Sequence, residues 1–562
     1  MGLLEKEEGT VRKDRGGRTT VCLVYPNTYS LGMTNLGFQM VYHLFNALPD
    51  VVCERAFLPA KEDIPEYSRT DTRLFSYESL KPLNDFDIIA FSVPFEEDYV
   101  NIPRILKLSG VEALSSKRGG GPLVAGGGVA LSLNPEPVAD FFDIFLVGEG
   151  EGSLAPFIDL FEKARKDGLD KKGTLRLFDT LAWAYVPSLY GFEYDGARIK
   201  EVRREKGAKE KVTAAKNFDL SAYELPENFV RTPESEFGGA SLLELERGCP
   251  RGCRFCAAGF LYLPPRWRDI GKVKEGVEKG IAATGKVGLV GTAVSEYPGI
   301  KEVLRCGAGL NGVMTLSSLR LDNLDAEFLG LLKEGGYKTI TLAPEAGTER
   351  MREIVNKGIT DAEIMESIRL ISEAGFLKLK LYFIVGFPAE TDDDAAGIVE
   401  LTKKIKAVLK RGEVALSVNP FIPKPFTPFQ WCAFADAAVI DRRLAIVKDG
   451  LKGERGVVVK EMGAKEAFIQ AYIARADRRA GEVIAGAAES GWKRALKKAG
   501  TLITTSVYSA KEKDDVLPWD IIDHGVKKEY LWKEYKKGLA GRLTPPCDVG
   551  ACFRCGVCRP GF

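Results

Sequence analysis

The stretch "ELERGCPRGCRFCAAGF", residues 244–260, decides the fold of this chain because it places three cysteines within eight positions. Cys249, Cys253 and Cys256, here called the triplet, follow the spacing C-x3-C-x2-C. A zinc site, a disulfide framework and an iron–sulfur cluster can each use such a group of thiols. A structural zinc ion takes four ligands, and residues 244–270 contain no fourth cysteine and no histidine. Three thiolates on a four-iron cluster leave one iron free for another molecule, so the triplet favours a cluster with an open iron.

The N-terminus and the cysteine usage indicate a reducing compartment. The first residues, "MGLLEKEEGTVRKDRGGRTT", are charged where a secretory signal is apolar, and no run of about 18 apolar residues occurs. We therefore expect a cytoplasmic protein without a membrane span. Under reducing conditions the eleven cysteines are not expected to form disulfides. Seven of them fall in two tight groups, which is typical of metal or cluster ligands.

The charge of the chain argues against a general affinity for polyanions. The formal net charge is +1, so no overall field attracts nucleic acid or an anionic membrane. Residues 441–540 are locally basic, with 21 Lys and Arg against 15 Asp and Glu. Such a surplus is ordinarily a solvated helix face, and RNA binding is the weaker alternative.

The N-terminal third of the chain alternates apolar strands with helical segments. With 562 residues the chain predicts roughly three to four domains. The strand-like runs are residues 21–26, 51–59, 87–95, 122–128 and 143–152. This alternation predicts a doubly wound parallel sheet in a domain at residues 1–180, with its glycine-rich strand ends at the ligand-binding edge. A hairpin with an Asp-Gly turn and a charged stretch form an expected linker at residues 181–238.

Six further strand–helix units follow the linker. Their strands are residues 240–246, 286–293, 312–318, 338–345, 378–388 and 413–423. They predict a partial (β/α)6 barrel at residues 239–432, with its chemistry at the carboxyl ends of the strands. The triplet directly follows the first of these strands, which places it on the catalytic rim. Residues 433–562 are expected to be mainly helical, so the predicted fold class is α/β throughout the first two parts, with a helical end.

With the triplet directly after the first strand of a predicted partial barrel, the chain resembles the radical S-adenosylmethionine (SAM) superfamily. In that superfamily a CxxxCxxC loop follows the first strand of a partial barrel. The resemblance implies that Cys249, Cys253 and Cys256 hold a 4Fe-4S cluster. It further implies that the amino and carboxylate groups of SAM chelate the open iron. One electron from the cluster then cleaves SAM to methionine and a 5'-deoxyadenosyl radical.

The later strand ends resemble the SAM-binding turns of that superfamily. The resemblance implies SAM contacts at the ends of strands two to six, namely Gly291, Thr292, Ser318, Arg320, Glu345 and Asn419. The turn Gly291-Thr292-Ala293 departs from the Gly-Gly-Glu-like turn that is usual there. Each of these residues also has a structural reading as a turn or a helix cap, and the sequence assigns no catalytic residue.

The N-terminal domain lacks the G-x-G-x-x-G motif of a dinucleotide site, and "YPNTYSLGMTNLG" follows its first strand instead. Placed before such a barrel, it resembles the cobalamin-binding domain of cobalamin-type radical SAM proteins, including a group with a cysteine-rich C-terminus. The resemblance implies a corrin site at Ser30, Gly32, Ser92, Gly126, Gly127, Gly148, Glu149 and Gly150. The D-x-H-x-x-G motif is absent and the chain has only His43 and His524, so a base-off corrin is expected. A corrin-free scaffold is the alternative.

The chain ends in a second cysteine group, here called the quartet. Its members, spaced C-x4-C-x2-C-x2-C, are Cys547, Cys552, Cys555 and Cys558. This spacing suits either a second iron–sulfur cluster or zinc. A cluster ligated by four thiolates has no open iron, so its role would be electron relay to the first cluster or anchoring of the C-terminal segment.

The sequence thus predicts an enzyme that generates a deoxyadenosyl radical and transfers a methyl group to an unactivated position of its substrate with the help of cobalamin. A cyclase, a rearranging enzyme or an RNA modifier is the first alternative. A cluster-bearing sensor without turnover is the second. The expected partners are the substrate, whose identity the residues do not reveal, and an electron donor such as a flavodoxin or a ferredoxin.

Overall fold

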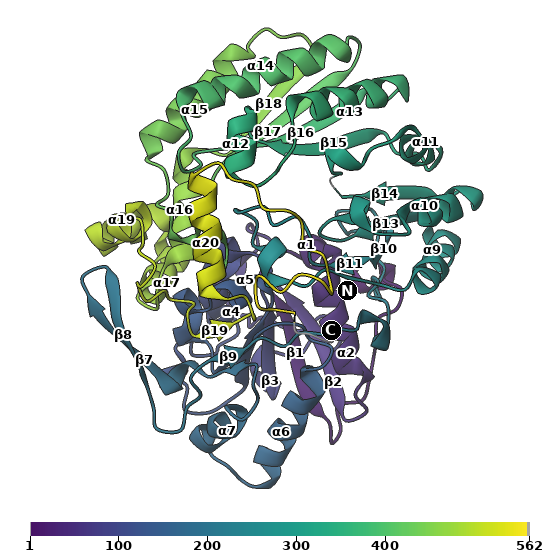
Figure 1. The fold of residues 1–562 in the computed structure, drawn as a ribbon. Coiled ribbons are helices and arrows are strands. Elements are labelled where there is room, and N and C mark those ends of the chain that lie inside the picture. Colours follow the sequence, from purple (N-terminus) through teal and green to yellow (C-terminus); the bar gives the residue numbers. More distant parts are fainter. Residues whose placement is uncertain (1, 318, 559–562) are drawn as a thin grey trace.

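The computed structural model describes residues 2–317 and 319–558 (Figure 1). Ser318, one of the expected SAM contacts, lies outside the described residues. The N-terminal sheet lies at the bottom of Figure 1, the barrel strands lie above it, and the last helix lies across the front. Among the helices of the described chain, none combines the length and the apolar character that a membrane crossing requires.

The N-terminal part contains the predicted doubly wound sheet. Its six strands have the order β2-β1-β3-β4-β5-β6. They are β1 (Thr19–Tyr25), β2 (Val51–Phe57), β3 (Ile88–Ser92), β4 (Leu123–Gly127), β5 (Ile144–Leu146) and β6 (Ala184–Tyr185). The first five are parallel, and β6 pairs antiparallel with β5. Because the strand order reverses between β1 and β3, a crevice opens outside the carboxyl ends of these strands, where ligands bind in folds of this type.

Helices flank this sheet, as the alternating sequence pattern predicts. They include α1 (Tyr29–Thr34), α2 (Leu36–Ala47), α4 (Asn101–Leu108), α5 (Val129–Leu133), α6 (Leu154–Lys166) and α7 (Lys171–Phe178). Every residue of β1 and β2 is buried, as expected for parallel strands that are covered on both faces. The expected hairpin follows as β7 (Tyr190–Asp195) and β8 (Arg198–Arg204), with Gly196 in the turn.

The second part forms an open barrel of parallel strands in two sheets. One sheet holds β10 (Ser241–Glu244), β13 (Lys286–Val290) and β14 (Val313–Leu316); the other holds β15 (Thr339–Glu345), β16 (Lys378–Val385), β17 (Glu413–Pro420) and β18 (Val457–Glu461). A parallel bridge between Leu319 and Leu342 links the two sheets. All six predicted strands are present. The seventh, β18, lies where the sequence analysis expected mainly helices, and its β-branched "VVV" was the overlooked signal.

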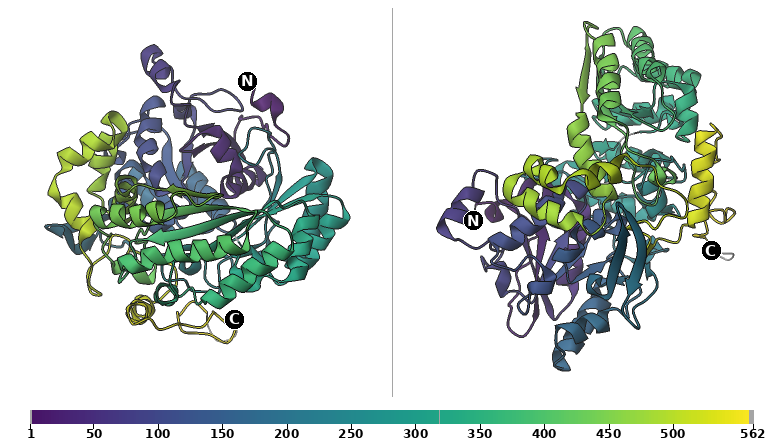
Figure 2. Two further views of the ribbon diagram at one scale, coloured as in Figure 1. Left: turned by 90° about the horizontal axis from the view of Figure 1, so that it is seen from above. Right: turned by 90° about the vertical axis from the view of Figure 1, so that its left-hand side faces the viewer.

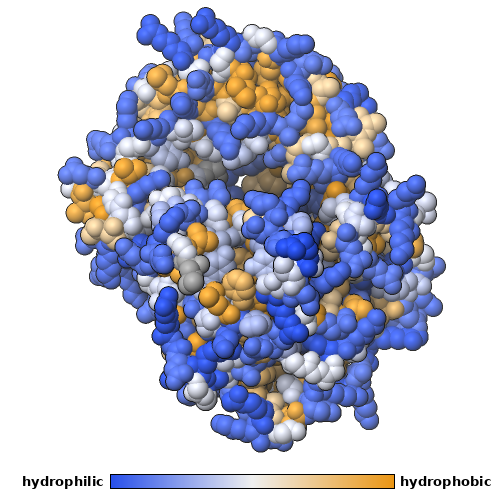
Figure 3. Space-filling model, turned by 180° about the vertical axis from the view of Figure 1, so that it is seen from behind, coloured by the Kyte–Doolittle hydropathy of each residue, from blue (hydrophilic) through white to orange (hydrophobic). Residues whose placement is uncertain are grey.

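Helices cover the outside of the barrel and leave its interior open. They are α9 (Ile270–Thr284), α10 (Ile300–Gly309), α11 (Ala326–Glu334), α13 (Asp361–Glu373), α14 (Asp392–Val408) and α15 (Ala437–Gly450). On β15, β16 and β17, buried residues alternate with half-buried ones, because one face packs on helices and the other lines the interior. Figure 3 shows a hollow on the reverse face of the molecule, below the sheet of β15 to β18.

The C-terminal part is mainly helical and runs back over both earlier parts. It contains α16 (Ala464–Arg475), α17 (Ala480–Ser490), α18 (Trp492–Ala499), α19 (Thr501–Tyr508) and α20 (Lys528–Leu539). A short strand, β19 (Ile522–Asp523), pairs with β9 (Val212–Thr213) of the linker. In the right-hand view of Figure 2, α20 and the tail that follows it lie on the side of the molecule opposite the N-terminus.

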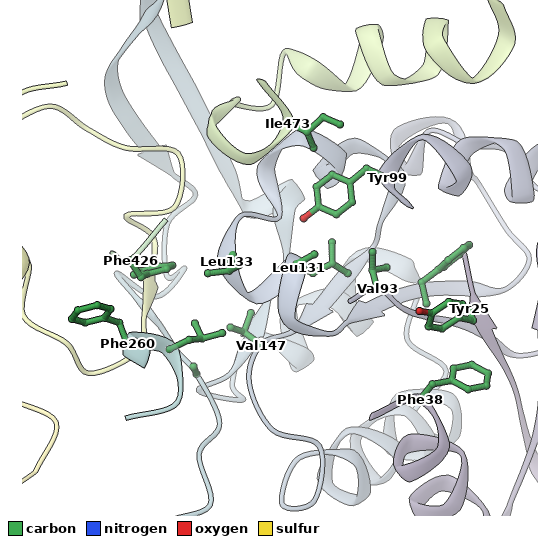
Figure 4. Close-up of a cluster of buried hydrophobic side chains, with 14 of the residues drawn as sticks. Tyr25, Phe38, Val93, Tyr99, Leu131, Leu133, Val147, Phe260, Phe426 and Ile473 are labelled. Carbon is green, nitrogen blue, oxygen red and sulfur yellow. The ribbon is translucent and has the colours of Figure 1, made fainter. Parts of the chain in front are cut away.

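One apolar core joins the three parts. Figure 4 shows Val93 and Val147, which directly follow β3 and β5, in the same cluster as Phe260 and Phe426 of the barrel part and Ile473 of α16. All five side chains are buried. The sheet edge and the barrel rim are therefore held in a fixed relation by shared packing.

Candidate active site and cofactor cavity

The triplet lies on a loop that follows β10 and the two-residue strand β11 (Glu246–Arg247). The loop is held by hydrogen bonds to Val355 and to the side chain of Asn356, which follow β15. Arg254 N–H donates to Val355 O over 2.9 Å, and the Asn356 amide donates to Arg251 O and Gly252 O over 3.2 and 3.1 Å. The loop is thereby fixed at the carboxyl ends of the barrel strands, where the sequence predicts the catalytic rim.

The three thiols are unpaired and lie within reach of each other's charge. Burial raises the pKa of Cys249 to about 12, and the nearby Cys253 adds to the rise. Burial likewise raises the pKa of Cys256 to about 11, again with a contribution from Cys253. In the described part of the chain, no three His, Cys, Asp or Glu side chains are placed so as to hold one metal ion. The donor set itself, three free thiols on one loop, matches the ligands of an iron–sulfur cluster, which binds them as thiolates.

Three charged side chains surround the triplet, and one of them was not predicted. Glu345, at the end of β15, lies 3.3 Å from Lys357 Nζ. Burial disfavours the Lys357 ammonium, but Glu345 holds its pKa above the ordinary value, so the charge is retained. Arg320 lies beside Cys253 and pairs with Asp322 over 2.9 Å and with Glu296 over 3.3 Å. The expected SAM contacts Arg320 and Glu345 thus come together, and Lys357 joins them.

Glu345 is held in a strained backbone conformation. Its φ is +70°, in the left-handed region that non-glycine residues seldom adopt. Such strain persists where the surrounding structure imposes it, which is common at ligand sites. Asn419, another expected contact, lies on β17 opposite Ile384 of β16 and is half-buried. It belongs to the strand face that lines the barrel interior.

The turn after β13 is occupied by a carboxylate that the sequence analysis did not single out. Glu246 Oε1 accepts a hydrogen bond from Ala293 N–H. A Cβ at Gly291 would lie 2.7 Å from the same oxygen, so a larger residue there would displace the carboxylate. Burial raises the pKa of Glu246 to about 7. The turn Gly291-Thr292-Ala293 therefore contacts the carboxyl group of Glu246 from β11, which titrates near neutral pH.

A cavity of about 540 Å³ lies where the N-terminal sheet meets the barrel. Six of the expected corrin contacts and two of the expected SAM contacts line it together: Ser92, Gly126, Gly127, Gly148, Glu149, Gly150, Gly291 and Thr292. Its walls are mostly apolar, with contributions from α2, α6 and α8 (Ala258–Leu261), which follows the triplet. Its volume is within the range of cofactor and small-molecule sites.

The glycines at the cavity differ in how much open space lies beside their backbone. A Cβ at Gly127 would meet only Leu146 O at 3.4 Å, and one at Gly150 would meet side-chain carbons at 3.7 Å or more. These two glycines therefore leave open space beside the backbone. A Cβ at Gly126 would instead lie 2.8 Å from Phe142, which shows that this glycine serves packing within the sheet.

Two expected corrin contacts lie outside the residues that line the cavity. Ser30 donates to Glu236 Oε1 over 2.8 Å, and Gly32 packs against Phe57. Glu149, another expected corrin contact, does line the cavity. Its carboxylate, however, is held by Arg266 at 2.7 Å and by Arg247 at 3.0 Å. Glu149 therefore ties the N-terminal sheet to the barrel loop.

Two cavity residues come from parts of the chain in which no sequence motif indicated a binding site. His524 lines the cavity, and its Nε2 lies 2.8 Å from Ser132 O. Burial lowers the pKa of His524 to about 3, so the ring is neutral at physiological pH. Lys216 also lines the cavity, and burial lowers its pKa to about 8. His43 lies elsewhere, stacked on Phe229 at 3.8 Å.

The comparisons with known proteins agree with this geometry. A family model described as "Radical SAM proteins, N-terminal" matches residues 37–187, and the model of the "Radical SAM superfamily" matches residues 243–402. An uncharacterized protein of Methanocaldococcus jannaschii is 31% identical over 459 residues, which cover 81% of this chain and 88% of that one. The chain belongs to the radical SAM superfamily. It is thus a radical SAM enzyme, whose cofactors include a 4Fe-4S cluster and SAM.

Two further comparisons give a more distant sequence relative and a solved structure of similar fold. The radical SAM protein is 25% identical to a tRNA-2-methylthio-N(6)-dimethylallyladenosine synthase of Ruegeria sp. over 312 residues, covering 51% of this chain and 66% of that one. Its fold is similar to that of the radical SAM methyltransferase TsrM of Kitasatospora setae, solved with tryptophan and a SAM analogue. That likeness has a TM-score of 0.50 and 13% identity, and it covers 85% of this chain and 99% of TsrM.

Proposed function

We propose that this radical SAM enzyme binds cobalamin in the cavity between the N-terminal sheet and the barrel, and that it transfers a methyl group to an unactivated position of its substrate. One observation carries the proposal: a single cavity of about 540 Å³ is lined both by the glycine-rich edge of the sheet and by Gly291 and Thr292 of the barrel rim. A cofactor in this cavity would face the site where SAM is expected.

The local chemistry of the cavity supports a corrin. Gly127 and Gly150 leave room for a flat macrocycle close to the backbone, and the apolar walls suit its hydrocarbon faces. The strand order places this cavity at the switch point between β1 and β3, the usual ligand position in doubly wound sheets. The similarity in fold to a radical SAM methyltransferase is a further argument for methyl transfer.

When bound, cobalamin would supply a carrier for the methyl group. The protein's own residues bind and orient the cofactors, and they exclude water. The charges of Arg320, Glu345 and Lys357 suit the amino and carboxylate groups of SAM beside the triplet. Glu246, whose pKa of about 7 allows it to hold or release a proton near neutrality, lines the same cavity. The apolar cavity walls keep water away from a reactive radical.

A cavity-filling variant tests the corrin site. Protein reconstituted with hydroxocobalamin and desalted should keep a base-off corrin spectrum. Gly150→Leu should lose it, because the new side chain occupies the cavity while its Cβ makes only ordinary contacts at 3.7 Å or more. Gly330→Leu is the control, since nothing lies within 4 Å of a Cβ there. Equal corrin retention by both variants, or none by the parent protein, would refute the site.

Methyl transfer is tested separately with SAM that carries a trideuterated methyl group. We expect the label in the corrin recovered from the protein, together with S-adenosylhomocysteine. If 5'-deoxyadenosine forms and the recovered corrin stays unlabelled, the methyl-transfer proposal fails while the radical SAM chemistry stands.

Modification of RNA is a second candidate, favoured by the similarity to a tRNA-modifying synthase and by the basic residues 441–540. In that case the protein should bind tRNA with an affinity that falls steeply as salt rises. Neutralising Lys497 and Lys498 at the end of α18 should weaken the binding and lower the salt dependence. No salt-dependent binding would exclude this candidate.

A further inference from the structure

The segment that carries the quartet is in direct contact with the triplet loop. Cys547 N–H donates to Pro250 O over 2.6 Å, which joins the tail to the residue that follows Cys249. A crevice of about 30 Å³ is lined by Cys249 together with Cys547, Cys552 and Cys555. One thiol of the triplet and three of the quartet, separated by about 300 positions in the sequence, thus line the same small crevice.

Buried polar contacts hold the tail in this place. Arg254, within the triplet loop, donates to Glu534 Oε2 of α20 over 3.2 Å and to Arg542 O over 2.6 Å. Thr544 N–H donates to Asn356 Oδ1 over 2.8 Å, and the same amide binds the triplet loop through its nitrogen. The position of the quartet is therefore fixed relative to the triplet by the fold and does not depend on a flexible tail.

The four thiols of the quartet are themselves grouped and unpaired. None of them forms a disulfide among the described residues. Cys547 lies within electrostatic reach of Cys552, Cys555 and Cys558, and Arg554 Nε donates to Cys552 Sγ over 3.1 Å. The Lys527 N–H donates to Cys555 O over 2.9 Å, which ties the cysteine loop to the start of α20. The spacing C-x4-C-x2-C-x2-C supplies the number and kind of ligands that a second cluster needs.

The segment around the quartet is basic. Residues 527–558 contain seven Lys and Arg against three Asp and Glu. One of these acids, Glu534, is buried and pairs with Arg254 and with Lys537 of the segment itself, and Lys528 pairs with Asp520. A basic surface favours docking of an acidic protein through electrostatic steering.

We infer that the quartet binds a second 4Fe-4S cluster, through which an acidic one-electron carrier of the flavodoxin or ferredoxin type reduces the cluster at the triplet. The carrier is oxidised by one electron, the quartet cluster passes that electron on, and the triplet cluster gains it; no covalent bond forms or breaks in the relay. All four irons of the quartet cluster are ligated by protein, which leaves SAM binding to the triplet. The inference rests on the radical SAM chemistry and is independent of methyl transfer.

Metal content tests the second cluster. Reconstituted parent protein should hold roughly eight irons per chain, and the variant Cys249→Ala/Cys253→Ala/Cys256→Ala roughly four. Cys552→Ser/Cys555→Ser should also hold roughly four. Cys306→Ser, a lone cysteine in α10, is the control and should match the parent. Roughly four irons in the parent, with or without one tightly held zinc that survives in the triplet variant, would overturn the inference.

The choice of reductant tests the relay. In Cys552→Ser/Cys555→Ser, SAM cleavage driven by reduced flavodoxin should fall about tenfold or more relative to cleavage driven by dithionite, a small reductant that needs no docking. An unchanged ratio of the two rates would overturn the relay.

The triplet variant gives a second readout that does not need SAM cleavage. Its remaining quartet cluster should be reduced directly by reduced flavodoxin, seen as loss of visible absorbance and a new electron paramagnetic resonance signal. High salt should slow this reduction, because docking is electrostatic. If the triplet variant binds four irons that flavodoxin does not reduce, the relay is wrong even though radical SAM activity in the parent is intact.

Discussion

Arg254, on the loop that carries the triplet, lies 3.2 Å from Glu534 of α20, and both side chains are almost completely buried. The contact joins residues that are 280 positions apart. It makes the C-terminal helix part of the support for the cysteine loop.

Removing one charge of this pair should destabilise the loop. Glu534→Gln leaves the Arg254 guanidinium buried without its counter-charge, which costs about 3–5 kcal/mol for pairs of this kind. The variant should unfold at lower urea and should lose iron from the triplet more readily. Asp167→Asn is the matched control, because its pair with Lys163 is exposed and worth less than about 1 kcal/mol. Equal effects of the two substitutions would contradict a stabilising role of the Arg254–Glu534 pair.

Glu246 should make stability depend on pH. Burial raises its pKa to about 7 in the folded protein, whereas an unfolded glutamate titrates near about 4.3. The folded state therefore binds the proton more tightly, so the stabilising contribution of the protonated Glu246 is full below about pH 4.3 and is lost as pH rises through about 7.

Glu246→Gln should abolish that decline. Its stability relative to the parent should increase between pH 5 and pH 8 by up to about 3 kcal/mol, measured from urea midpoints. The exposed Glu489→Gln is the control. A constant difference between Glu246→Gln and the parent at the two pH values would show that the carboxylate does not titrate in this range.

Arg266 should hold the N-terminal sheet against the barrel. It binds Glu149 at 2.7 Å, and Arg266 and Arg247 together hold the pKa of Glu149 below its ordinary value against the effect of burial. Arg266→Leu should speed proteolysis of residues 186–240, the segment between β6 and β10, by roughly tenfold or more. Arg176→Leu, which removes a more exposed pair with Glu205, should leave the cleavage rate near that of the parent.

Lys357 should act on SAM through its charge. Lys357→Gln removes the ammonium 3.3 Å from Glu345 and should lower SAM cleavage about tenfold or more, with a raised KM for SAM. Lys378→Gln, at the exposed start of β16, is the control. Unchanged kinetics in Lys357→Gln would place the lysine outside the SAM site.

The parts of this protein that local sequence determines could be predicted. Alternating apolar runs and glycine-rich ends specify parallel strands, and the two cysteine groups stand out by spacing alone. The N-terminal sheet, the six predicted barrel strands and the placement of the triplet after the first of them follow from such patterns. The strand β18 was missed because the helical pattern on both sides of "VVV" outweighed a short β-branched run.

The residues that the fold brings together from a distance could not be predicted. His524 reaches the cavity by contact with Ser132, which is 392 positions away, and Glu246 reaches the turn after β13. Neither residue stands in a motif, because its position depends on how separate elements pack. The crevice shared by Cys249 and the quartet is likewise a tertiary feature, since each cysteine group fixes only its own loop.

Formation of 5'-deoxyadenosine from SAM tests the account most directly. Anaerobically reconstituted and reduced protein should produce it, as measured by liquid chromatography and mass spectrometry. Cys253→Ala should produce none above the background of reductant alone, while Cys306→Ala should match the parent, because Cys306 lies on α10 away from the triplet loop. Equal production by Cys253→Ala and the parent would contradict the assignment of the triplet as the cluster that cleaves SAM.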